Sequence, residues 1–191
     1  MSLITPEFRG TWVFLTHPQV KDKAKPENGK AYSITAYFPP EADLSQLKAD
    51  AQEAVVKKFG SPEKVPKVYR SPFRLNEEQD KPQEGVPGDW IMMRFSMNEF
   101  DSKGAQQRPG LVDAKLQDII DPSEVYSGAW FRAQVNCSWY DKSGNKGVGF
   151  YLNNAQKTRD DEPLGGSRVP ASKAFEAFGA PAGKSANSLF D

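Results

Sequence analysis

Aromatic and polar side chains alternate along residues 128–140, in a spacing that could hold a flat, negatively charged ligand. Successive side chains of a strand point to opposite faces. One set is apolar, and we expect it in a core: Phe131, Ala133, Val135, Cys137 and Trp139. The other set places an arginine and amides between aromatic ends: Trp130, Arg132, Gln134, Asn136, Ser138 and Tyr140. Nucleobases stack on aromatic rings, arginine contacts phosphate or stacks, and amides bond to base edges.

The same alternation in other segments adds more rings and cations. Trp12, Phe14, Tyr37 and Arg94 fall on strand faces opposite those expected to build the core. With nearby loop and hairpin residues, the candidate nucleic-acid contacts are Trp12, Phe14, Tyr37, Arg94, Lys103, Arg108, Trp130, Arg132, Gln134, Asn136, Tyr140, Lys146 and Tyr151. A second candidate patch comprises Tyr69, Arg70, Phe73 and Arg74.

A purely structural interpretation of these rings stays open. A helix or long loop could cover the outer face of the sheet, and its aromatic residues would then form a second layer of core. The arginine among the rings of residues 130–140 argues against this, because arginine is seldom buried without a carboxylate partner.

Five strands are expected to position these side chains. Their ranges are residues 9–17, 30–38, 90–98, 128–140 and 147–156. The apolar spacing of residues 44–59 predicts a helix between the second and third strands, with Asp43 as N-cap and Gly60 at its end. The proline-rich residues 61–89 are expected to form a long surface excursion, and residues 99–125 a loop.

This order favours a mainly β fold, a five-stranded OB-fold-like antiparallel barrel with one inserted α-helix and long loops. Residues 1–166 are expected to form an OB-fold DNA-binding domain, and residues 167–191 a flexible C-terminal tail with a short helix near 171–178. The helix position departs from the commonest OB order, but loops of such folds accept insertions.

Charge and composition limit the classes of protein to which this chain could belong. The 25 basic and 25 acidic residues cancel, yet residues 126–159 carry five cations and one acid, so a neutral total can hide a basic face. The single cysteine and the lack of a long apolar run or signal pattern predict a soluble protein of a reducing cytoplasm.

Two other classes of function remain as alternatives. For an enzyme, the single His17 and single Cys137 give no metal quartet or nucleophile pair, and no phosphate-binding loop motif occurs. Residues 160–162 are three successive acids that could hold magnesium, but a solvated loop is the more ordinary interpretation. We therefore expect no catalysis, no metal and no cofactor. The other alternative is an OB-like protein-interaction or structural module without DNA binding.

Residues 108–166 carry a series of motifs that resembles a known family. They are Arg108 to Asp113, Tyr126-Ser127-Gly128 followed by Trp130 and Arg132, a glycine-rich hairpin at 144–147, Leu152-Asn153-Asn154 with Gln156-Lys157, and Glu162 to Gly166. The series is similar to that of a tailed-phage single-stranded DNA-binding family, formerly a domain of unknown function and similar to the phage T7-type OB-fold proteins.

The resemblance implies sequence-independent binding of single-stranded DNA in phage replication or recombination, within the cytoplasm of the infected bacterial host. It implies no metal or nucleotide. Such proteins often end in an acidic run closed by an aromatic residue that recruits replication proteins. Here Phe190 is present but acidic residues are few, which puts recruitment of phage or host replication proteins through the tail in doubt.

Overall fold

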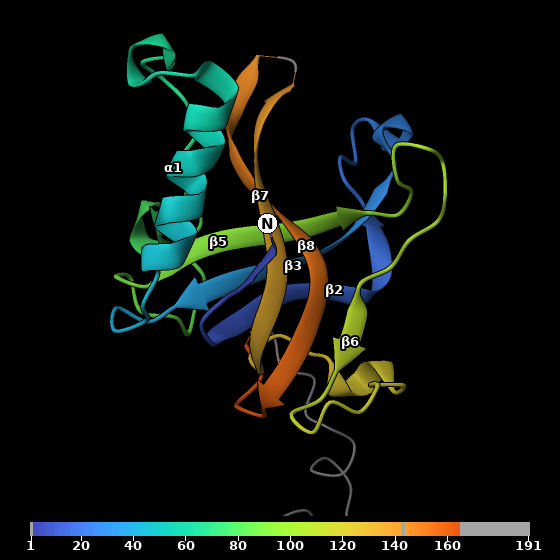
Figure 1. The fold of residues 1–191 in the computed structure, drawn as a ribbon. Coiled ribbons are helices and arrows are strands. Elements are labelled where there is room, and N and C mark those ends of the chain that lie inside the picture. Colours follow the sequence, from blue (N-terminus) through green and yellow to red (C-terminus); the bar gives the residue numbers. More distant parts are fainter. Residues whose placement is uncertain (1, 143, 165–191) are drawn as a thin grey trace, which may run out of the picture.

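The computed structural model describes residues 2–142 and 144–164, and its regular elements are mainly strands. The strands are β1 (Ser2–Ile4), β2 (Phe8–Val20), β3 (Lys30–Phe38), β4 (Arg74–Leu75), β5 (Ile91–Asn98), β6 (Gly110–Val112), β7 (Trp130–Lys142) and β8 (Asn145–Arg159). One α-helix, α1 (Ser45–Phe59), lies between β3 and β5 along the chain (Figure 1). Short 3-10 turns occupy Pro26–Asn28, Pro62–Lys64, Asn76–Glu78 and Pro122–Glu124.

Five of the strands close into a ring. β2 pairs with β3, β3 with β5, β8 with β7, and β7 with β2, all antiparallel. The ring is completed by a short parallel pairing of β5 with β8, in which Phe95 lies opposite Phe150. The expected mainly β, OB-like architecture with one inserted helix and long loops is therefore confirmed, although the pairings of β8 with β5 and β6 are parallel rather than antiparallel.

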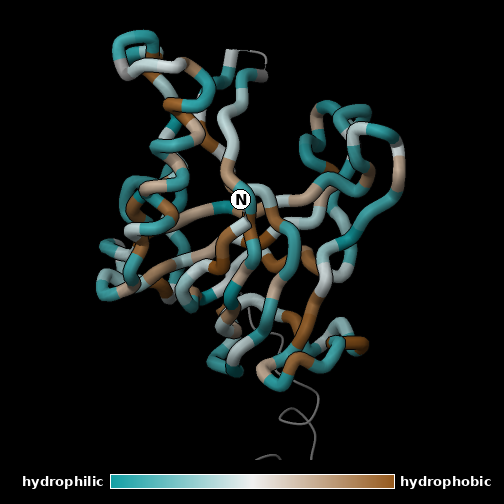
Figure 2. The backbone as a smooth tube through the Cα atoms, in the orientation of Figure 1, coloured by the Kyte–Doolittle hydropathy of each residue, from teal (hydrophilic) through white to brown (hydrophobic). Residues whose placement is uncertain are grey.

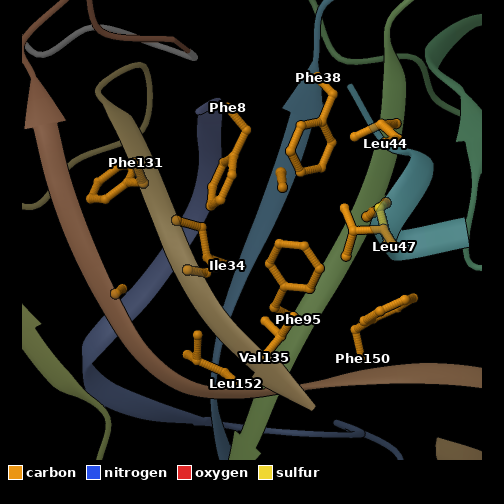
Figure 3. Packing of buried hydrophobic residues seen from close by; sticks show 14 of the residues in the cluster. Phe8, Ile34, Phe38, Leu44, Leu47, Phe95, Phe131, Val135, Phe150 and Leu152 are labelled. Carbon is orange, nitrogen blue, oxygen red and sulfur yellow. The ribbon is translucent and has the colours of Figure 1, made fainter. Parts of the chain in front are cut away.

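The interior of the ring is filled by aromatic and aliphatic side chains. Phe8 packs edge-on against Phe38 and Phe95, with ring centroids 5.3 and 5.7 Å apart (Figure 3). Phe131 is fully buried beside Gly10, where a Cβ atom would lie 2.7 Å from the Phe131 ring. Phe131 falls on the face assigned to the core from strand alternation. Hydrophilic residues predominate on the peripheral loops (Figure 2).

Helix α1 covers one end of the core with Leu47, Ala51 and Val55. The Asp43 carboxylate accepts a 2.9 Å hydrogen bond from the Ser45 backbone N–H, which satisfies one donor at the start of the helix. Gly60 ends the helix in the left-handed region at φ 75°. The helix bounds predicted from sequence are thus confirmed within one residue, although Leu44 rather than Asp43 is the N-cap. No helix within the described ranges has the length and apolar character needed to span a membrane.

The short strands were not predicted. β1 and β6 have three residues each and β4 has two, too few for alternation to be visible. β2 continues past Pro18 because its register shifts between Phe14 and Gln19, so no ladder hydrogen bond is required from the proline.

Candidate nucleic-acid interface

The outward faces of β2, β3, β5 and β8 form an elongated depression, which we call the strand-face groove. It consists of two adjoining cavities of about 490 and 740 Å³ that share Arg74, Asp80 and Arg94. The first cavity is further lined by Trp12, Phe14, Thr35, Tyr37, Gln79, Lys81 and Met92. The second is further lined by residues 70–73, Glu78, Ser96, Tyr140 and residues 148–151.

At one end of the groove the exposed ring of Trp12 projects from a distorted part of β2. The register with β3 shifts between Thr11 and Phe14, and Trp12 has a φ of 48°. A bulky residue rarely adopts this left-handed conformation, which costs about 1–3 kcal/mol. The side chain is 63% exposed, so burial of the ring offsets little of this conformational free energy. The bulge instead aims an aromatic ring at the groove.

At the other end, two tyrosines lie over glycines of β8. Tyr140 pairs with Gly147, where a Cβ atom would lie 2.9 Å from the Tyr140 hydroxyl oxygen. At Gly149 a Cβ atom would lie 3.5 Å from the Tyr140 ring and 3.6 Å from the Tyr151 hydroxyl oxygen. Burial, and then the neighbouring Tyr140, raise the pKa of Tyr151, so its hydroxyl stays uncharged near neutral pH. The glycines make room for aromatic side chains on the outer surface.

Cationic side chains lie between these aromatic ends. Arg94 extends from β5 and donates a 3.3 Å hydrogen bond to Ser33 Oγ. The groove lining contains four cationic residues and two carboxylates: Arg70, Arg74, Lys81 and Arg94, with Glu78 and Asp80. The ion pairs formed within residues 2–142 and 144–164 involve none of these cations. Their charge is therefore available to an anionic ligand.

One wall of the groove is built by the loop between α1 and β5, and a buried asparagine holds that wall. Asn76 Nδ2 donates to the Val86 carbonyl at 2.8 Å, and Asn76 Oδ1 accepts from the Gln83 backbone N–H at 2.8 Å. β4 attaches the same loop to β5, with Arg74 opposite Met92. Sequence analysis gave no role to Asn76, because hydrogen bonds to backbone groups leave no pattern in residue types.

The structure gathers six of the predicted contact residues at the groove: Trp12, Phe14, Tyr37, Arg94, Tyr140 and Tyr151. Tyr37 lines the cavity but is largely buried against Val86 and Met92. Three residues of the second predicted patch, Arg70, Phe73 and Arg74, line the same groove. The predictions missed Lys81 and Gln79, whose positions depend on how the long loop folds back over the sheet, and Met92 of β5.

Trp130 requires a correction. It is only 9% exposed, and its Nε1 donates a 2.7 Å hydrogen bond to the Asp161 carboxylate. The Arg159 guanidinium lies 3.9 Å from the ring centroid, and the Trp90 ring packs nearby at 5.9 Å. The expectation that Trp130, Arg132 and Tyr140 share one open surface is wrong, because residues 159–164 fold over the tryptophan. For this residue, the alternative of a second core layer is the correct one.

The acids at 160–162 are engaged by the protein itself. Asp160 forms an ion pair with Lys157 at 2.7 Å and accepts a 2.8 Å hydrogen bond from the Tyr126 hydroxyl. These contacts, the Lys157 bond first, lower the pKa of Asp160. Among the described residues, no group of three or more histidine, cysteine or acidic side chains could hold a metal ion.

The remaining predicted contacts lie outside the groove. Gln134 and Asn136 face outward on β7, but their amides bond to Asn154 and Asn153 of β8. Lys146 pairs with Asp141 at 3.5 Å in the β7–β8 hairpin. The other three are exposed on β7 or in loops: Arg132, Lys103 and Arg108.

Comparison with known proteins finds related proteins both by sequence and by fold. A profile of the family described as the single-stranded DNA-binding protein of Enterobacter phage Enc34 matches residues 1–186. No curated protein matches the chain.

Among solved structures, the fold is similar to the single-stranded DNA-binding protein from bacteriophage Enc34, with 19% identity over 92% of this chain and 90% of that chain, and a TM-score of 0.62. The same phage protein in complex with single-stranded DNA gives 17% identity, coverage of 86% and 89%, and a TM-score of 0.64. Protein gp2.5 of bacteriophage T7, a single-stranded DNA-binding protein, gives 14% identity, coverage of 96% and 99%, and a TM-score of 0.61.

Proposed function

Because the chain belongs to the family of the Enc34 phage single-stranded DNA-binding protein, we propose that it binds single-stranded DNA in the strand-face groove. The observation that carries this proposal is the lining of the groove, which combines aromatic rings at both ends with four cations between them. Rings and cations in one open channel suit a ligand that has flat bases and a charged backbone.

Bases would stack on the rings of Trp12, Tyr140 and Tyr151. Stacking contributes about 1–3 kcal/mol per base and depends little on base identity, so binding would be tolerant of sequence. Base-paired DNA hides these faces within its stack. The proposed contact therefore favours unpaired strands.

Phosphates would be held by Arg94, Arg74, Arg70 and Lys81. Each neutralised phosphate releases condensed counterions, so affinity should fall steeply with salt concentration. We propose that the protein acts without catalysis, metal or cofactor, and that it coats exposed strands during phage DNA replication or recombination in the host cytoplasm. The tail at residues 167–191 lies outside the described residues, and recruitment of replication proteins through it stays a prediction.

The test is a fluorescence titration with oligo(dT) at several salt concentrations. Of the four tryptophans, Trp12 is the exposed one, so its emission should be quenched as bases stack on it. Trp12→Phe keeps a ring at the position and should retain binding in an anisotropy assay while losing most of the quenching. A protein-interaction module would show neither quenching nor a salt-dependent affinity for oligo(dT).

A further inference from the structure

A second basic surface adjoins the end of the groove where Tyr140 lies. It is formed by the last turn of α1, the loop that follows it and the part of β7 around Trp139, which lie side by side (Figure 1). Phe59 packs against Trp139 with ring centroids 4.9 Å apart, and Tyr69 lies 5.5 Å from the same indole. We call this surface the basic corner. Its aromatic contacts fix three separate segments relative to one another.

The basic corner carries a strong local excess of positive charge. Residues 57–70 contain five cations against the single acid Glu63: Lys57, Lys58, Lys64, Lys67 and Arg70. All five are exposed. None of them takes part in the ion pairs that the described residues form. Tyr69, 43% exposed, adds an aromatic ring to this surface.

The basic corner is continuous with the groove through Arg70. This residue lines the groove, while its backbone N–H donates to the Lys146 carbonyl at 2.8 Å and its own carbonyl accepts from Val148. A strand lying along the groove past Tyr140 would therefore meet Arg70 next, and then the lysines beyond it. Two of the cations, Lys57 and Lys58, also have an ordinary role, since cations stabilise the C-terminal end of a helix. Lys64 and Lys67 follow the helix and have no such role.

We infer that the basic corner is an extension of the binding site, which holds phosphates of single-stranded DNA where the strand leaves the groove. The inference rests on the proposed function of the groove. It assigns Lys64 and Lys67 to backbone contact without base recognition, because isolated lysines on a loop bind phosphate as point charges.

The experiment compares short and long oligo(dT) on the wild type and on Lys64→Gln/Lys67→Gln. Single OB-folds cover about 4–16 nucleotides, so oligomers of about 5 and about 16 nucleotides separate the groove from its extension. Each phosphate contact on a single strand contributes about 0.7 to the slope of log affinity against log salt. The variant should therefore lose about 1.4 of that slope on the long oligomer and nothing on the short one.

The control is Lys23→Gln/Lys25→Gln, which removes two exposed lysines from the loop between β2 and β3, outside both surfaces. It should leave both slopes unchanged. The extension is overturned if the control loses as much slope as the Lys64/Lys67 variant. It is also overturned if that variant keeps the wild-type slope on the long oligomer. In both cases, binding of the short oligomer still supports the groove. A wild type that binds neither oligomer overturns the groove and the extension together.

Discussion

The indole Nε1 of Trp130 donates a 2.7 Å hydrogen bond to the carboxylate of Asp161, and this contact attaches the end of the described chain to the strand ring. Arg159 covers the same ring at 3.9 Å and forms an ion pair with Glu7 at 3.1 Å. A residue whose type suggests a ligand platform is therefore part of the packing that holds residues 159–164 in place.

Trp130→Ala should unfold the protein more easily rather than weaken DNA binding selectively. Loss of a buried tryptophan costs about 3–5 kcal/mol of unfolding free energy, because the cavity collapses only partly. Trp130→Phe, which keeps an aromatic ring and removes the hydrogen bond to a partly exposed carboxylate, should cost about 1 kcal/mol. Urea unfolding measures both costs. If Trp130→Ala kept wild-type stability and lost only its affinity for oligo(dT), burial of this ring would not contribute to the unfolding free energy.

Acid should destabilise the protein partly through Asp161. The hydrogen bond from Trp130, followed by that from the Glu162 backbone, lowers the pKa of Asp161 below its ordinary 3.8. A lowered pKa in the folded state gives stability that is present above the unfolded pKa and is lost as pH falls through the folded value. In urea titrations below pH 3.8, Asp161→Asn should therefore show a smaller acid-induced loss than the wild type. Glu84→Gln, a change on the exposed loop, should lose stability as the wild type does.

Gly147 and Gly149 offer a matched pair of substitutions at the tyrosine end of the groove. A Cβ atom at Gly147 would lie 2.6 Å from the Arg70 carbonyl oxygen, a backbone atom that cannot move alone. Gly147→Ala should thus cost about 1–3 kcal/mol and displace the loop that carries Arg70. At Gly149 the nearest atom would be 3.5 Å away, so Gly149→Ala should be nearly neutral in thermal unfolding. Equal melting temperatures for the two variants would contradict this packing.

Trp12→Gly should stabilise the fold and weaken DNA binding at the same time. Glycine adopts a φ of 48° without strain, and removal of the strained conformation is worth about 1 kcal/mol, while an exposed indole has little burial to lose. Trp12→Ala, which keeps a Cβ atom, should weaken binding without that gain. Chemical denaturation and oligo(dT) anisotropy on the three proteins separate the effects. A less stable Trp12→Gly protein would show that the bulge is not strained.

Strand alternation predicted the inner face of β7. Phe131, Ala133 and Val135 are buried as expected, because one buried face leaves a period of two in the sequence. The helix was predictable within one residue, since Gly60 and the apolar spacing before it mark its end. These features depend on neighbours within a few positions of the chain.

Features that depend on distant segments were not predictable in the same way. Trp130 is covered by a segment about 30 residues later, and nothing in the spacing of β7 distinguishes it from Tyr140. Asp161 and Arg159 were the sequence features that could have indicated burial of Trp130, because a carboxylate can accept a hydrogen bond from an indole and a guanidinium can cover its ring. The groove wall depends on Asn76, whose partners Gln83 and Val86 lie in a loop with no periodic pattern.

The central claim is that single-stranded DNA lies in the strand-face groove. The most direct measurement is the salt dependence of oligo(dT) affinity for Arg74→Gln/Arg94→Gln, compared with Arg108→Gln/Arg132→Gln, which removes two exposed arginines outside the groove. The account predicts that the groove variant binds more weakly and loses about 1.4 of the log–log slope, at about 0.7 per phosphate, while the other variant matches the wild type. The reverse pattern, with the loss confined to Arg108→Gln/Arg132→Gln, would place the DNA on the other face and contradict the account.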